Sequence, residues 1–530
     1  MLMRCLLGFV GTMPAVPAQE TVLKLPDYVA LAEREPDLRP TAAVATDLAG
    51  RRMVTRLEAA DLAAFGVTRV EDLSPRVPGA VAAPIYGVIG VPLIRGDLGD
   101  TAWNGQRQAY NRNVFPVSFN GVEAVEVLSG APPAWLGYTN GTGGFLNFIA
   151  KPARFRAERN LQVSVGSWND VRVQFDATGA VTDDLAARVS IERGEAGSFY
   201  RGLSSDSWSA YVALAWRPRP EVTWDLNAEV YSVNFAENPG TNRPTQALID
   251  RGEYITGTSV QLGGTGSYFG NTFVPTGTVR IDGSQILLAP GDSGWARTAK
   301  LQLIGTVKAA KGREVVSRTY VERVSGEKAA AYAFYSYLPR SLTAEQRIEV
   351  RETRGWLGRE HRVTWGAALR GEERKSFVDF FNEAMNAFDL TLDPDTYRLP
   401  PGQFFGVRPV PGREGRRAIS GARYPVAPTA SISQTLHSWL GNAGIFAEDA
   451  VSVSDALTLT LGARTDGVHV TSEDSLPAPG YAPVRDSLKE LLTSANASLA
   501  WRANASWTLF ATINQAAAME PSSGSGGYGL

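Results

Sequence analysis

The chain has 530 residues, and its 52 basic residues nearly balance its 54 acidic residues, so no excess of positive charge favours nucleic-acid binding. Hydrophobic residues make up 44% of the composition, yet no run of about 18 apolar residues is present that could cross a bilayer as a helix. A membrane protein with this composition must be a closed β-barrel, because every backbone polar group in lipid needs an internal partner. A large secreted β-protein would have the same composition, so both classes stay open at this point.

The N-terminal segment predicts export from the cytoplasm. One basic residue, Arg4, precedes a short apolar stretch that ends in small residues, which is typical of a signal peptide cleaved near Ala18. The single cysteine, Cys5, lies inside this segment, so we expect the mature protein to contain no disulfide. Residues 19–45 are polar and contain proline, which predicts an extended linker.

Residues 46–153 are expected to form a compact mixed α/β domain. Short helical stretches are predicted at Leu57–Phe65 and Val70–Leu73, and brief strands rich in Val and Ile follow. Further along, polar and aromatic residues lie beside glycine, as they often do in binding loops and also in ordinary loops. The candidates for ligand contacts in these loops are Trp103, Arg107, Tyr110 and Arg112.

After residue 154 the pattern changes to alternating apolar and polar residues, which predicts β-strands. Apolar residues alternate along Trp208–Trp216 and, after a turn at Arg217–Pro220, along Val222–Val230. Between the apolar residues of the second stretch lie Thr, Asp, Asn and Glu, which cannot face a dry core but can line a wet lumen. Short turns alternate with long segments such as 236–294 and 378–436, as expected of an outer-membrane barrel.

A soluble β-sandwich would also produce alternation, although paired tryptophans at strand ends favour the barrel. An enzyme is disfavoured, because His361, His437 and His469 are the only histidines and are widely separated. Neither zinc-ligand spacing nor a cysteine cluster is present. The glycines of Gly141–Gly144 lack the lysine of a phosphate-binding loop. We therefore expect no catalytic residues, no metal ligands and no cofactor.

The most informative motif lies between Val122 and Pro152. A strand with Glu, Val, Leu and Gly is followed by a glycine turn, a Gly-Gly pair, an asparagine and a final strand that ends at Lys151. This order resembles the core of the plug domain of TonB-dependent outer-membrane receptors, although Ser129, Leu136 and Ala150 depart from the usual residues. The matching residues are Glu126, Leu128, Gly130, Gly137, Gly143, Gly144 and Asn147.

Three further segments resemble the same family in the same order. The hexapeptide Glu20-Thr21-Val22-Leu23-Lys24-Leu25 resembles a TonB box, an extended segment that a partner can bind by strand addition. Ile94-Arg95-Gly96 resembles the family's Ile-Arg-Gly strand, and the resemblance implies that Arg95 pairs with carboxylates of the barrel wall as a latch. Gly166-Ser167-Trp168 resembles the first barrel hairpin.

The resemblance implies a mainly β protein with a mixed α/β plug inside a transmembrane antiparallel β-barrel. We expect a signal peptide at 1–18, a periplasmic linker with the TonB box at 19–45, the plug at 46–153 and the barrel at 154–530. The C-terminal sequence resembles an extracellular loop and the candidate strands are fewer than in large plugged transporters, so we expect an incomplete barrel, truncated at the C-terminus.

By the same resemblance, the protein is expected in the outer membrane of a Gram-negative bacterium, in contact with its lipid. The implied function is import of a ferric siderophore, energised by TonB with ExbB and ExbD. A receptor for a carbohydrate or another organic nutrient, and a non-transporting barrel or adhesin, are the alternatives.

Overall fold

The computed structural model describes fourteen stretches of the chain: residues 54–81, 93–110, 115–130, 132–258, 274–309, 312–330, 334–380, 388–394, 408–413, 418–419, 432–477, 480–504, 507–521 and 527–528. They all belong to one compact unit that spans Pro40–Leu530. The predicted signal peptide, the predicted TonB box at Glu20–Leu25 and the candidate Arg112 lie outside the described residues.

The first part of the chain folds into a small mixed sheet, called the plug sheet here, with the strand order β1-β6-β7-β4-β3-β2 and β5 paired with β4. Strands β4 and β7 are parallel, and the other pairs are antiparallel. Its strands are β1 (Val54–Glu58), β2 (Ala80–Val81), β3 (Leu93–Ile94), β4 (Asp97–Trp103), β5 (Gln106–Arg107), β6 (Val122–Ser129) and β7 (Gly144–Ala150).

Short helices cover the plug sheet. Helix α2 (Ala59–Ala64) begins with a capping box in which the Glu58 backbone N–H donates to Asp61, and the 3₁₀ helix η1 spans Val70–Arg76. The first predicted helix therefore begins later than expected, because Leu57 belongs to β1 and pairs with β6. A second 3₁₀ turn, η2 (Ala134–Leu136), lies between β6 and β7.

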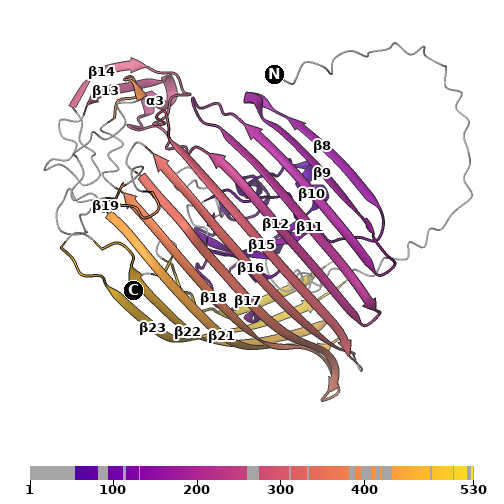
Figure 1. Cartoon of the computed structure of the whole chain (residues 1–530). Coiled ribbons are helices and arrows are strands. Elements are labelled where there is room, and N and C mark those ends of the chain that lie inside the picture. Colours follow the sequence, from indigo (N-terminus) through magenta and orange to yellow (C-terminus); the bar gives the residue numbers. More distant parts are fainter. Residues whose placement is uncertain are drawn as a thin grey trace, which may run out of the picture. The chain divides into compact units, whose positions relative to one another are not determined.

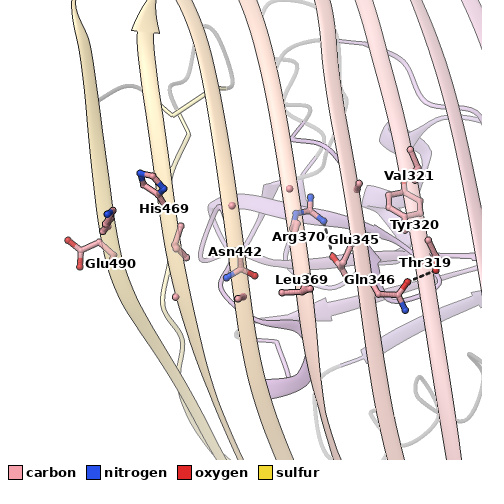
Figure 2. Close-up of a pocket in the computed structure, with 17 residues that line it drawn as sticks. Thr319, Tyr320, Val321, Glu345, Gln346, Leu369, Arg370, Asn442, His469 and Glu490 are labelled. Atoms are coloured by element: carbon pink, nitrogen blue, oxygen red, sulfur yellow. Dashed lines mark hydrogen bonds and ion pairs between the residues drawn. The ribbon is translucent and has the colours of Figure 1, made fainter.

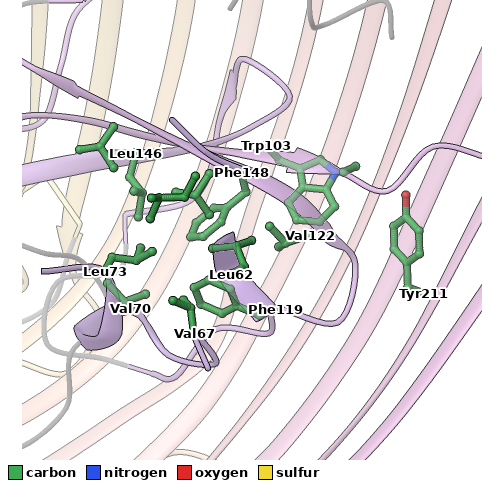
Figure 3. Packing of buried hydrophobic residues seen from close by; sticks show 14 of the residues in the cluster. Leu62, Val67, Val70, Leu73, Trp103, Phe119, Val122, Leu146, Phe148 and Tyr211 are labelled. Atoms are coloured by element: carbon green, nitrogen blue, oxygen red, sulfur yellow. The ribbon is translucent and has the colours of Figure 1, made fainter. Parts of the chain in front are cut away.

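The hydrophobic core of this region lies between the plug sheet, its helices and three strands of the larger sheet, which contribute Ala186, Tyr211, Ala213, Ala215 and Tyr320. Leu62 and Leu73 of the helices pack beneath Leu146 and Phe148 of β7, as Figure 3 shows. Phe119 meets Phe148 edge to face, with ring centroids 5.6 Å apart. This packing buries both faces of β7 and of β6 up to Leu128, so neither strand alternates between buried and exposed residues.

Most described residues between Glu158 and Gln515 form a thirteen-stranded antiparallel sheet, called the wall here, in which strands that follow one another in sequence are neighbours in space. Figure 1 shows the long tilted strands curving around the plug sheet. Strands β8 and β24 are the two ends of the described sheet, which does not close into a full circle. The strands are β8 (Glu158–Val165), β9 (Val171–Ala180), β10 (Leu185–Ala196), β11 (Ser205–Arg219), β12 (Val222–Phe235), β15 (Ser293–Ala309), β16 (Arg313–Ala330), β17 (Phe334–Trp356), β18 (Arg359–Phe380), β21 (Ile432–Ser454), β22 (Leu457–Asp474), β23 (Arg485–Arg502) and β24 (Thr508–Gln515).

Along much of the wall, outward apolar residues alternate with inward polar residues, which confirms the alternation predicted from the sequence. On β11, Trp208, Val212 and Trp216 are exposed, whereas Tyr211 is fully buried against the plug sheet. Short turns connect the strands at one end of the wall, and long segments connect them at the other. The fold class predicted from the sequence is therefore confirmed, including the unclosed barrel.

At the end with long connections, two of these segments pack together. Helix α3 (Gln246–Arg251) and the hairpin β13 (Glu253–Thr258) and β14 (Val274–Arg280) contact residues 388–390 around a small core. The remaining elements are the turn η3 (Ser167–Asn169) and the short pair β19 (Arg408–Pro409) and β20 (Ala418–Ile419). No helix in the described part of the chain has the length and apolar character needed to span a membrane.

Candidate functional site

The plug motif predicted from the sequence forms a connected buried network. Asn147 on β7 donates to Glu126 on β6 across 3.1 Å, and the Asn147 side-chain oxygen accepts a hydrogen bond from the Gly105 backbone at 2.8 Å. Arg56 on β1 forms an ion pair with the other oxygen of Glu126. Burial raises the pKa of Glu126, whereas the hydrogen bonds from Asn147 and Arg56 oppose that shift. Glu126 thus ties three plug strands and the β4–β5 turn together.

The glycines of the motif allow two close backbone contacts. A Cβ atom on Gly143 would lie 2.5 Å from the carbonyl oxygen of Ile94 and closer still to that of Asp97. Gly144 has a φ of 156° and crowds the carbonyl oxygen of Leu128. No side chain fits at either position, so these glycines let the β7 backbone enter between neighbouring strands.

Other motif residues lie at turns around the same strands. Ile94 is fully buried, and Arg95 and Gly96 form the turn between β3 and β4 with φ values of 54° and 85°. The Arg95 side chain is exposed and lies close to Gly79 and Gly130, which are both plug residues. The latch role of Arg95 remains a prediction, whereas contacts with the wall are made by the residues described next.

Two of the candidate ligand contacts lie in the seam between plug and wall. The Trp103 indole N–H donates to Asn227 of β12 at 2.6 Å, and the Lys300 ammonium lies 3.7 Å from the ring centroid. Arg107 donates to the backbone oxygen of Tyr138 and stacks on its ring. The Tyr110 side chain is half-buried. Ligand contact by the candidates Trp103, Arg107, Tyr110 and Arg112 remains a prediction.

Further contacts from the wall come from arginines that were not predicted from the sequence. Arg347 donates to the backbone oxygen of Gly105 at 3.0 Å, and Arg374 donates to that of Tyr110 at 2.8 Å. Arg370 donates to two successive plug carbonyls, Arg107 at 2.7 Å and Gln108 at 3.2 Å. These three wall arginines, called the arginine grip here, therefore hold the plug segment 105–110 through its backbone.

Wall carboxylates neutralise the arginine grip. Glu345 and Glu372 accept hydrogen bonds from Arg370 at 2.9 and 2.6 Å, and Glu349 forms an ion pair with Arg347 at 2.7 Å. All of these groups are largely buried, so each charge depends on its partners. A sequence pattern could have predicted this cluster. Glu and Arg alternate at every second position along 345–351, so all four charged side chains lie on one face of the strand.

A cavity of about 410 Å³, called the vestibule here, lies between plug and wall at the end with long connections. Plug residues 68–71 and 116–117 line one side, and wall residues of β9 to β12 with the loop 197–204 line the other. Its hydroxyl-bearing side chains are Thr68, Ser198, Tyr200, Ser204, Ser205, Ser207 and Tyr231. The guanidinium groups come from Arg69 and Arg172. The vestibule can bind a compact, oxygen-rich ligand by hydrogen bonds and ring contacts.

An ion pair joins the two wall loops beside the vestibule. Arg201 binds Asp282 at 2.6 Å, and both the backbone and the hydroxyl of Ser284 donate to the same carboxylate. The hydrogen bonds from Ser284 lower the pKa of Asp282 to about 2. In an unfolded loop this carboxyl would titrate near its ordinary value of 3.8.

We expect this loop contact to survive mild acid. A carboxyl whose pKa is lowered by folding stabilises the fold above its unfolded pKa, and this contribution is lost as the pH falls toward about 2. Hydrogen exchange of 199–204 should therefore stay slow at pH 5 in the wild type and become faster in Asp282→Asn at the same pH. Equal exchange in both proteins would show that the carboxylate does not hold the loops.

The segment after β24 returns toward the plug. The backbone N–H of Thr139 donates to Ala517, and the backbone N–H of Met519 donates to Thr139, so this segment adds a short parallel bridge to the plug. The Tyr528 hydroxyl donates to Asn140 at 3.1 Å, and its ring packs in a core with Tyr138. Among the described residues, no group of three or more His, Cys, Asp or Glu side chains could hold a metal ion.

Comparison with known proteins identifies both the wall and the whole fold. Residues 231–529 match the family model described as TonB dependent receptor-like, beta-barrel. No curated protein sequence matches the chain.

Similar solved structures include the ferric-catecholate import receptor Fiu of E. coli K12, with 14% identity, a TM-score of 0.66, and coverage of 89% of this chain and 70% of that chain. The siderophore receptor PiuA of Acinetobacter baumannii has 13% identity and a TM-score of 0.64 over 88% and 65% of the two chains. The ferripyoverdine receptor of Pseudomonas aeruginosa, solved with ferripyoverdine bound, has 16% identity and a TM-score of 0.62 over 88% and 57%. The chain thus spans between 57% and 70% of the length of these structures.

Proposed function

The chain belongs to the family of TonB-dependent receptors, and we propose that it imports a ferric siderophore across the outer membrane, energised by TonB with ExbB and ExbD. The family's members are outer-membrane receptors and transporters and not enzymes. The observation that carries the proposal is a plug sheet held against the wall by polar contacts beside a vestibule of about 410 Å³. An energised importer needs a plug that is held firmly at rest and can still move, and hydrogen bonds to backbone carbonyls meet both needs.

The chemistry of the vestibule supports the choice of substrate. A ferric siderophore is a compact complex with many oxygen atoms, which hydroxyl and guanidinium donors such as Tyr200, Tyr231 and Arg172 would bind. The names of the similar structures, a ferric-catecholate receptor, a siderophore receptor and a ferripyoverdine receptor, point to the same class. A carbohydrate is the second candidate, because serine and tyrosine hydroxyls also suit sugars.

The remaining parts of the proposal concern segments and roles inferred from the sequence. We propose cleavage of a signal peptide near Ala18, contact of TonB with Glu20–Leu25, and division of the mature chain into plug and barrel near residue 153. The motif residues from Glu126 to Asn147 are proposed to stabilise the plug. Arg95 is proposed as a latch that pairs with carboxylates of the barrel wall and must be released during transport.

Deleting Glu20–Leu25 is the test of this function. Cells that produce the full chain should accumulate radioactive iron supplied as a ferric siderophore, and cells that produce the deletion should bind it at the surface without accumulating it. A deletion of the same length at residues 30–35 is the control and should leave uptake unchanged. Competition by an oligosaccharide instead of the siderophore would favour the carbohydrate receptor. Uptake that is insensitive to the deletion of Glu20–Leu25 would favour a non-transporting barrel.

A further inference from the structure

A second cavity lies on the outward face of the wall, away from plug and vestibule. This groove has a volume of about 880 Å³ and crosses the strands from β16 to β23. On five of these strands it is lined by three consecutive residues, as in 369–371 of β18, and Figure 2 shows them side by side. The middle residue of each triplet points inward, as Arg370 does toward Glu345, so its first and third residues face outward.

Missing side chains create the groove. Its floor contains three glycines, Gly371, Gly441 and Gly467, of which Gly371 pairs with Gly441, and two alanines, Ala344 opposite Gly371 and Ala443 opposite Gly467. An added Cβ atom would find nothing within 4 Å at Gly441, and only a backbone oxygen 3.9 to 4.0 Å away at the other two. None of the three glycines has a positive φ. Neither packing nor backbone conformation within the chain therefore requires glycine at these positions.

The two sides of the groove differ in chemistry. Toward the end with short turns, the outward face is apolar, with Ile348, Leu369 and Ile445 exposed. Toward the end with long connections, Lys489 of β23 lies opposite His469 of β22, and both line the groove. The outward residues Ile348, Leu369 and Ile445 belong to an apolar belt of the wall, and Lys489 and His469 belong to a second belt, called the cationic belt here. The groove crosses the boundary between these two belts.

The cationic belt carries unneutralised charge. Two of its glutamates are already paired, Glu373 with Arg340 at 2.8 Å and Glu473 with His437 at 3.5 Å. A third glutamate, the groove residue Glu490, follows Lys489 and pairs with the buried Val468, so it alternates to the opposite face of β23. Lys489 forms no ion pair with any residue of the described ranges, and the exposed outward arginines of this belt, Arg323 and Arg485, form none either. An anion from outside the chain is therefore the complementary partner.

We propose that this groove binds a phosphorylated lipid of the outer leaflet, with an acyl chain along the glycine floor and a phosphate at Lys489 and His469. An acyl chain would fill a hollow that otherwise leaves apolar surface poorly packed in the membrane. The phosphate would accept charge-assisted hydrogen bonds from Lys489. The long connections mark the extracellular end of a barrel in this family, which places the cationic belt at the outer leaflet. The inference rests on the outer-membrane location and is independent of the transported substrate.

The test uses the full chain purified in a neutral detergent and native mass spectrometry to count bound lipid. The probes are diphosphoryl lipid A, its dephosphorylated form and phosphatidylcholine at equal concentrations. Wild type should bind the diphosphorylated probe more tightly than both others. Gly441→Leu, which fills the groove, and Lys489→Glu, which reverses the charge, should each weaken this binding by about 10-fold or more.

Matched controls separate the site from general effects of bulk and charge. Ala228→Leu adds the same kind of bulk to the outward face of β12, and Lys308→Glu reverses a charge at the end with short turns. Both controls should bind the diphosphorylated probe like wild type. Equal binding of all three probes, or wild-type binding by Gly441→Leu, would overturn the proposal. A dimer that disappears in Gly441→Leu would also overturn it, since the groove would then bind a second copy of this chain.

Discussion

Replacing Arg370 with alanine is expected to lower the free energy of unfolding by about 3–5 kcal/mol, the loss that follows when one member of a buried ion pair is removed. The substitution would leave Glu345 and Glu372 without their nearest cation and would remove both hydrogen bonds to the plug segment at 107–108. Urea titration of the purified chain, followed by hydrogen exchange at residues 106–110, measures the effect. Exchange in the outward part of the wall should change little.

Two further variants make the Arg370 experiment specific. Arg354→Ala removes an exposed arginine of β17 whose pair with Glu352 lies at 3.6 Å, and exposed pairs contribute about 0–1 kcal/mol. Arg370→Lys keeps the charge but cannot donate from a planar fork to two carbonyls and two carboxylates, so an intermediate loss is expected. Unchanged stability in Arg370→Ala would show that the arginine grip does not hold the plug.

Gly143→Ala is expected to cost about 1–3 kcal/mol, the usual cost of overpacking, and to loosen the plug sheet in particular. The new methyl group would meet the carbonyl oxygens of Ile94 and Asp97, and backbone atoms cannot rotate away as a side chain can. The parallel pairing of β4 with β7 should then exchange its amide hydrogens faster than in wild type.

Gly355→Ala is the matched control, since a Cβ atom there would meet nothing within 4 Å. It should leave both stability and exchange unchanged. Wild-type exchange of β4 and β7 in Gly143→Ala would mean that the backbone relaxes at this point without cost, and that the Gly-Gly pair is not needed for the plug sheet.

The wall was predictable from the sequence because inward polar residues alternate with outward apolar residues along its strands. The stretches Trp208–Trp216 and Val222–Val230 alternate with a period of two, and they became β11 and β12. The turn between them is shorter than the predicted Arg217–Pro220, because β11 continues to Arg219 and the chain turns at residues 220–221. The plug strands were less visible, because β7 is buried on both faces and does not alternate. There the glycines and asparagine of the family motif supplied the prediction instead.

The seam between plug and wall could not be read from the sequence for a different reason. Arg370 and Arg107 are 263 positions apart, and only the curvature of the wall brings them together. Moreover, Arg370 binds backbone carbonyls, which every residue has. The residue types of the plug segment therefore do not predict this contact. The sequence around Trp103 likewise did not indicate that its indole N–H would donate a hydrogen bond to Asn227.

The arginine grip also bears on how such a chain can diverge. Because Arg347, Arg370 and Arg374 bind carbonyl oxygens, the side chains of the plug segment 105–110 are not what the wall recognises at these points. Substitutions in that segment would therefore keep these backbone hydrogen bonds, provided that the backbone path is kept, although the side chains of Gln106 and Gln108 make further contacts with Gln302 and Glu322 of the wall. A lineage could in this way acquire new ligand preferences in its plug loops while the wall that holds them stays unchanged.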